Sequence, residues 1–140
     1  MNLQNLRMVK MFMVKMVHKN PKTRGRRAEL RTFLLWGWIR IQDKIQRGSV
    51  EWVACEAHER VHWDQYKRSY GFHPVMYKFS KKYRLEAELE AYAAEYKSYG
   101  THSSQRMTRY KLAIMNDYGL GDFTNGPDVL KELWKRVGEG

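Results

Sequence analysis

The segment His58-Glu59-Arg60-Val61-His62 carries two imidazoles and a carboxylate at a spacing that suits metal chemistry. On a helix, residues four positions apart project from the same face, so His58 and His62 can bind one ion together. A single zinc ion needs this spacing from two of its ligands. The Glu59 carboxylate would then lie beside the metal, where it can act as general base for a metal-bound water.

A zinc site needs at least one more protein ligand, and the candidates downstream are Glu86, Glu88, Glu90, His73 and His102. On a helix over residues 83–99, Glu88 lies about 60° from the centre of the apolar stripe and Glu86 about 100° from it. The pattern therefore favours Glu88 as the third ligand. In the alternative, one of Glu86 and Glu90 binds the metal and the other orients a histidine.

The helix that carries both histidines is expected from an N-cap at Ser49 to about Ser69. On a helical wheel one sector of about 120° holds mostly small or apolar residues together with the histidines. Its members are Ala54, Cys55, His58, Val61, His62 and Gln65. Charged residues occupy the opposite side, and Glu59 falls at the border of the inward face, where it could reach a metal-bound water.

A strand is predicted just before this helix, over residues 32–42, which are rich in aromatic and β-branched side chains. Trp36 and Trp38 alternate with Gly37, Ile39 and Ile41, as a half-buried strand requires. Such a strand can pair with the backbone of an extended peptide.

The remaining segments are predicted to be mostly helical. An amphipathic helix is favoured over residues 2–19, although the apolar run 11–17 is equally compatible with a strand. Further helices are expected over 75–82, 83–99 with Gly100 as C-cap, 103–118, and from Pro127 to Val137. The prediction is one α+β, predominantly helical domain over residues 1–140, with a basic segment (1–28), a metal-site core (32–99) and C-terminal helices (103–137).

Composition and charge limit the class of protein. A lone Cys55 cannot form an internal disulfide, which predicts a reducing, cytoplasmic location. Apolar runs fall far short of the roughly 18 residues of a membrane-spanning helix. The net charge is +11, and residues 1–28 hold eight Lys and Arg without an acid. This segment could bind nucleic acid or another anionic partner, or be a solvated basic arm.

The histidine segment resembles small zincin-type, gluzincin-like zinc metallopeptidases when its neighbours are included. The resemblance covers about residues 34–97 and rests on Gln65-Tyr66, Gly71, Pro74, Tyr77 and Glu86-x-Glu88-x-Glu90-Ala91-Tyr92 after the first motif. It implies a minimal zincin-like fold, with a short strand or small sheet before the active-site helix. In gluzincins the third ligand often stands in Glu-x-x-Ala followed by Asp or Asn. Glu88 fits, but Tyr92 stands where the acid or amide would be.

The resemblance implies zinc-dependent hydrolysis of a protein or peptide substrate. His58, His62 and Glu88 would hold Zn²⁺, and Glu59 would move a proton from the metal-bound water to the leaving amine. A donor for the oxyanion would come from Tyr92, Tyr96, His73 or His102. The alternative is a basic module for nucleic acid or another anionic partner, whose zinc site is structural or inactive.

Overall fold

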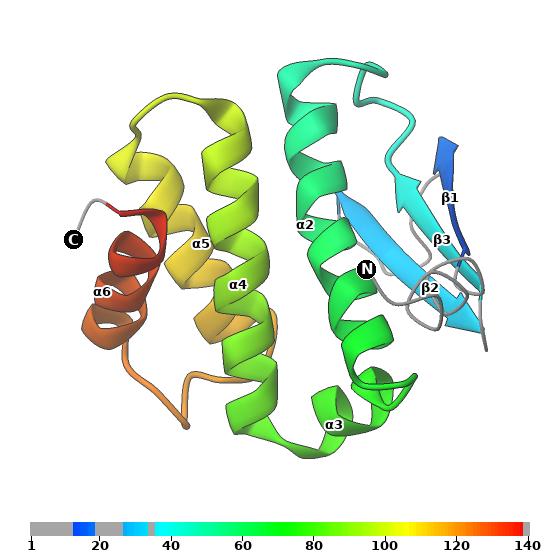
Figure 1. Cartoon of the computed structure of the whole chain (residues 1–140). Coiled ribbons are helices and arrows are strands. Elements are labelled where there is room, and N and C mark those ends of the chain that lie inside the picture. Colours follow the sequence, from blue (N-terminus) through cyan, green and yellow to red (C-terminus); the bar gives the residue numbers. More distant parts are fainter. Residues whose placement is uncertain (1–12, 19–26, 34–35, 139–140) are drawn as a thin grey trace, which may run out of the picture.

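The computed structural model describes residues 13–18, 27–33 and 36–138, and these form a small sheet followed by a helical array (Figure 1). The strands are β1 (Met13–His18), β2 (Ala28–Phe33) and β3 (Trp36–Ile41). The helices are α2 (Val50–Arg68), α3 (His73–Phe79), α4 (Lys81–Tyr99), α5 (Ser104–Asn116) and α6 (Gly126–Val137). The predicted fold class, α+β and predominantly helical, is confirmed.

The sheet places β3 at its centre, with β1 parallel to it on one side and β2 antiparallel on the other. The predicted alternation along β3 is confirmed, because Ile39 and Ile41 are fully buried whereas Trp36 and Trp38 are exposed. Gly37 lies on the buried face, where a Cβ would come within 2.8 Å of the Trp63 ring. A glycine is therefore needed for α2 to approach the sheet this closely.

Helix α2 lies between the sheet and α4, and α5 and α6 pack on the far side of α4 (Figure 1). One apolar cluster joins the sheet to α2 through Ala28, Ile39, Ile41, Ile45, Trp52 and Cys55. The second joins α4, α5 and α6, with Leu89, Met107, Ile114 and Leu133 among its members. Buried polar side chains occur on both α2 and α4, the two helices that separate these clusters: His58, Glu59, His62, Gln65, Glu88 and Glu95.

The N-terminal prediction is wrong where it can be checked. Residues 13–18 form a strand, as the alternative proposed, rather than part of a helix. Val14 and Met16 pack against the sheet core, while Lys15 between them is exposed. Pairing with β3 thus makes successive side chains alternate between the two faces of the sheet, although the spacing of the apolar residues also suited a helix. The rest of the predicted 2–19 helix lies outside the described residues.

The other predicted elements agree with the structure to within a few residues at their ends. There are two exceptions. The first two residues of the predicted 32–42 strand belong to an additional strand, β2, and the predicted 75–82 helix is found at His73–Phe79. Lys81 and Lys82 belong to α4 because Ser80 caps that helix, its side chain accepting a hydrogen bond from the Tyr83 N–H. Among the described residues, no helix is long and apolar enough to cross a membrane.

Candidate metal centre

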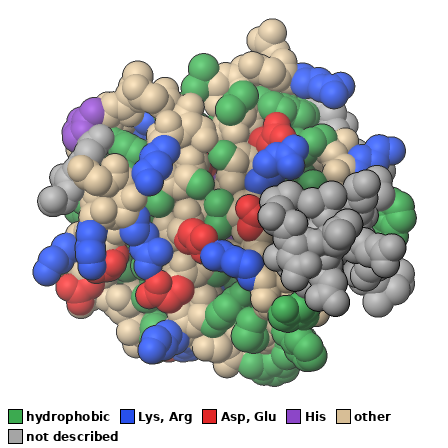
Figure 2. All heavy atoms as spheres, viewed as in Figure 1, with side chains coloured by type: hydrophobic (Ala, Val, Ile, Leu, Met, Phe, Trp, Pro, Cys, Tyr) green, Lys and Arg blue, Asp and Glu red, His purple; other side chains and the backbone are tan. Residues whose placement is uncertain are grey.

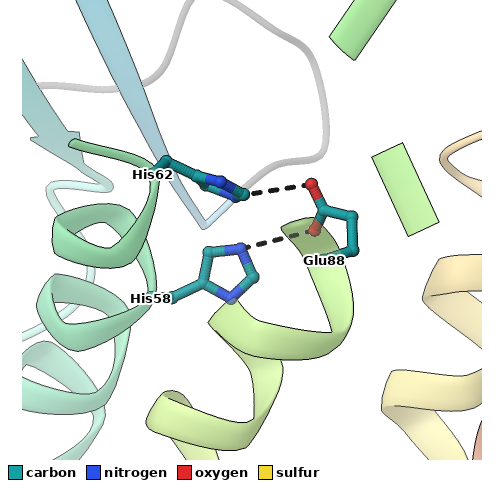
Figure 3. Close-up of side chains that lie close together, drawn as sticks. All are labelled: His58, His62 and Glu88. Atoms are coloured by element: carbon teal, nitrogen blue, oxygen red, sulfur yellow. Dashed lines mark ion pairs between the residues drawn. The ribbon is translucent and has the colours of Figure 1, made fainter. Parts of the chain in front are cut away.

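Three buried side chains from two helices converge between α2 and α4 (Figure 3). The Nε2 atom of His62 lies 3.3 Å from Oε1 of Glu88, and Nε2 of His58 lies 3.6 Å from Oε2 of the same carboxylate. One potential ligand atom from each residue lies within 4.8 Å of the others. The structure thus brings together the three residues that the sequence favoured.

Local sequence fixes the two helices that carry these residues. The Ser49 side chain accepts a hydrogen bond from the Trp52 N–H and so starts α2 about two and a half turns before His58. Gly100, in the left-handed conformation, ends α4. Because His58 and His62 are four residues apart, they stack along the side of α2 that faces Glu88.

Gln65 holds the ring of His62. Its Oε1 lies 2.8 Å from Nδ1 of His62, while its Nε2 donates to the Ala87 carbonyl and to Glu90 Oε2. These two donations identify the amide oxygen as the atom facing the histidine, so Nδ1 of His62 carries the proton. When the ring is neutral, the lone pair of Nε2 therefore faces Glu88.

Glu95 occupies the equivalent position at His58. Its Oε2 lies 3.0 Å from Nδ1 of His58, and its Oε1 accepts a hydrogen bond from Arg27. Glu95 is 2% exposed, so Arg27 compensates a charge that burial would otherwise disfavour. A carboxylate beside Nδ1 again leaves Nε2 as the atom available to a metal.

Aromatic residues complete the surroundings of the three side chains. The Tyr77 hydroxyl donates a hydrogen bond to Oε1 of Glu88. The Tyr92 ring meets the ring of His58 edge to face, with centroids 4.5 Å apart. Tyr92 therefore takes no part in holding a histidine through a polar group; Glu95, three residues later on α4, supplies that group.

The three side chains could hold a metal ion, as their spacing and one buried oxygen indicate. Tetrahedral zinc with bonds near 2.0–2.1 Å separates its ligand atoms by about 3.3 Å. The nitrogen-to-oxygen separations of 3.3 and 3.6 Å end on different oxygens of Glu88, and a set with one ligand atom from each residue lies within 4.8 Å. Oε2 of Glu88 is buried without a hydrogen-bond partner, which a native structure rarely leaves uncompensated.

The ion-free cluster retains protons on its histidines. Burial alone would lower the pKa of His58, but contacts with Glu88 and Glu95 raise it to about 10. Burial likewise opposes a raised pKa at His62, and the charge of Glu88 overcomes it. Burial would raise the pKa of Glu88, yet the two histidines hold it well below its ordinary value. Two imidazolium rings thus stand in for the positive charge that a metal would supply.

Glu59 is 6% exposed and lines a cleft of about 560 Å³ together with His58, Tyr92, Glu95 and Tyr118. Residues of α5 and its C-terminal end form the other wall of the cleft: Arg106, Arg109, Tyr110 and Asp117. Of the three candidate ligands, His58 thus shares this cleft with Glu59.

The other candidates from the sequence lie elsewhere or play different parts. Glu86 is exposed and pairs with Arg136. The Tyr96 hydroxyl accepts a hydrogen bond from the Ser103 N–H, and the His102 ring stacks on Trp134. Near the centre, the His73 ring lies 5.7 Å from that of His62.

The sequence assigned no role at the centre to three of its residues: Glu95, Arg27 and Tyr77, of which Tyr77 was noted only as part of the resemblance. Glu95 follows Glu88 by seven residues, or two helical turns, so it shares the same face of α4 and could have been identified. Arg27 and Tyr77 reach the site only because β2 and α3 pack where they do. No local pattern indicates either contact.

In comparisons with known proteins, no family model, curated protein or solved structure matches this chain.

Proposed function

We propose that this chain is a zinc-dependent peptidase of the gluzincin type, with His58, His62 and Glu88 as metal ligands. The observation that carries the proposal is the convergence of these side chains beside a cleft that is lined by His58 and Glu59. A structural zinc site would be closed by four protein ligands. Within the described residues, only three His, Cys, Asp or Glu side chains meet at this position.

Bound zinc would supply a Lewis acid that activates water and polarises a carbonyl. Glu59 would accept the proton of the attacking water and deliver it to the leaving amine. The hydroxyls of Tyr92 and Tyr118 lie 3.3 Å apart, and both residues line the cleft. Burial raises the pKa of both, so they remain protonated donors for the developing oxyanion. Of the four donors considered from sequence, this arrangement favours Tyr92.

Metal analysis and a matched pair of variants test the proposal. Purified protein should hold about one zinc per chain, and His58→Ala/His62→Ala should lose it. Glu59→Gln should keep the metal but lose hydrolysis of a mixed quenched-peptide library. Full zinc retention by the double variant refutes the ligand set. Undiminished hydrolysis by Glu59→Gln refutes the role of the base.

A second candidate function, binding of single-stranded nucleic acid, is favoured by the outer face of the sheet. Trp36 and Trp38 are 52% and 37% exposed there, and Trp38 pairs in register with the exposed Lys15 on one side and Arg31 on the other. Exposed aromatic rings among cations are the elements that stack bases and follow a phosphate backbone. The protein should bind labelled oligo(dT) with an affinity that falls steeply as salt is added, and the Trp36→Ala/Trp38→Ala variant should bind it more weakly. Equal binding by the variant and the unaltered protein would exclude this face as the nucleic-acid site.

A further inference from the structure

The outward side of α3 and the turn before it form an exposed apolar surface, here named the α3 patch. It consists of Tyr70, Phe72, Val75 and Phe79, which are 73%, 64%, 53% and 77% exposed. Figure 2 shows hydrophobic side chains gathered at the lower edge of the molecule, where α3 lies in Figure 1. Four large apolar side chains this exposed within ten residues exceed the isolated apolar residues usual on a protein surface.

The α3 patch is not needed to hold α3 in place. The inward side of the helix does this, because Tyr77 donates to Glu88 and Nδ1 of His73 lies 2.8 Å from the Tyr83 hydroxyl. Phe72 and Phe79 project away from these contacts into solvent. The contacts that hold α3 therefore do not use these two rings, which leaves them available to a ligand.

Basic residues are frequent around the patch. Residues 65–85 contain six cations and no acid: Lys67, Arg68, Lys78, Lys81, Lys82 and Arg84. Three of them form ion pairs with acids outside this segment, and Arg84 donates to backbone carbonyls, so Lys78 and Lys82 are the cations that the patch can present to a ligand. Lys78 and Lys82 are both exposed, and the Lys78 ammonium lies 5.4 Å from the Phe79 ring centroid. Apolar side chains bordered by cations match a surface that is negatively charged outside and apolar just beneath.

We propose that the α3 patch docks this protein on an anionic lipid bilayer. Phe72, Val75 and Phe79 would enter the boundary between headgroups and acyl chains, and Lys78 and Lys82 would meet the lipid phosphates. The patch stands on the outside of a short helix at one end of the molecule rather than in the cleft beside Glu59. A protruding surface suits a flat membrane, whereas a helical or proline-rich peptide is usually held in a groove.

Vesicle co-sedimentation of the full chain tests the proposal. The protein should bind vesicles of phosphatidylcholine with about 30% phosphatidylserine more tightly than pure phosphatidylcholine vesicles, with the difference reduced in about 0.5 M salt. Phe72→Ser/Phe79→Ser should weaken binding at least about tenfold, because two inserting side chains are lost. Lys78→Glu/Lys82→Glu should weaken binding only to the anionic vesicles.

A matched variant separates the patch from the basic N-terminal segment, which also attracts anionic vesicles. Leu112→Ser/Phe123→Ser removes two apolar side chains that are 49% and 46% exposed elsewhere, and should bind as the unaltered protein does. Equal binding by Phe72→Ser/Phe79→Ser, or no binding of the unaltered chain, overturns the proposal. Loss of oligo(dT) binding in this variant, with lipid binding unchanged, would assign the patch to nucleic acid instead.

The membrane proposal does not depend on the metal centre. Zinc content and thermal unfolding of Phe72→Ser/Phe79→Ser should match the unaltered protein, which shows that only the surface has changed. A protein without zinc that still binds vesicles through the α3 patch would refute the proposed peptidase alone.

Discussion

Oε2 of Glu95 on α4 lies 3.0 Å from Nδ1 of His58 on α2, and the same carboxylate accepts a hydrogen bond from Arg27, which directly precedes β2. One buried charge thus links the sheet and both helices of the metal centre. Because Glu95 contacts the ring nitrogen opposite the cluster, it orients His58 without occupying a ligand position.

Glu95→Gln is expected to weaken zinc binding about 10- to 100-fold, the usual effect of losing a carboxylate behind a histidine ligand. Competition with a chromophoric chelator measures this affinity. Glu86→Gln is the matched control, because it makes the same chemical change on the same helix at an exposed residue paired with Arg136. An equal loss of affinity in both variants would contradict the assigned role and would reopen Glu86 as a ligand.

The stabilising effect of zinc should increase with pH. The pKa of His58 is raised to about 10 from an ordinary 6.5, so its proton stabilises the metal-free fold fully below pH 6.5, and that contribution is lost as pH rises toward 10. Metal binding requires the neutral ring and must displace this proton. The difference in melting temperature between zinc-loaded and chelator-treated protein should therefore widen from about pH 6 to pH 9. A constant difference would contradict the prediction.

Gly37→Ala should destabilise the fold by about 1–3 kcal/mol, as overpacking of a core does. The added Cβ would lie 2.8 Å from the Trp63 ring, and a ring wedged between β3 and α2 cannot move aside freely. Urea unfolding gives the free-energy difference. The same substitution in a Trp63→Leu background should cost less, and an undiminished cost would show that the strain arises elsewhere.

Cys55 should be unreactive in the native protein. It is 2% exposed, and burial raises the pKa of its thiol to about 12 against the opposing effect of Arg27. The thiolate, which is the reactive form, is then scarce near neutral pH. Iodoacetamide should label Cys55 slowly in buffer and rapidly in strong denaturant. Fast labelling of the folded chain would show that α2 opens locally.

Local patterns in the sequence were sufficient for most of the helices and for the central strand. Ser49 and Gly100 were predicted as caps, and their chemistry acts within one turn, so the start of α2 and the end of α4 follow from neighbouring residues. The cap at Ser80 was not predicted, and the start of α4 was placed two residues too late. The spacing of His58 and His62 places them on one face for the same reason. The angle of Glu88 from the apolar stripe indicated that it would face inward, and it is 1% exposed.

Other features depended on contacts between distant segments. Residues 13–18 are a strand because β3 offers them a pairing edge, which a local apolar run cannot reveal. Arg27 and Tyr77 reach Glu95 and Glu88 only after β2 and α3 have packed. The sequence by itself determined which residues share a helix face. Tertiary structure decided which faces meet and which buried charges are compensated, because those depend on distances between segments and not on spacing within one.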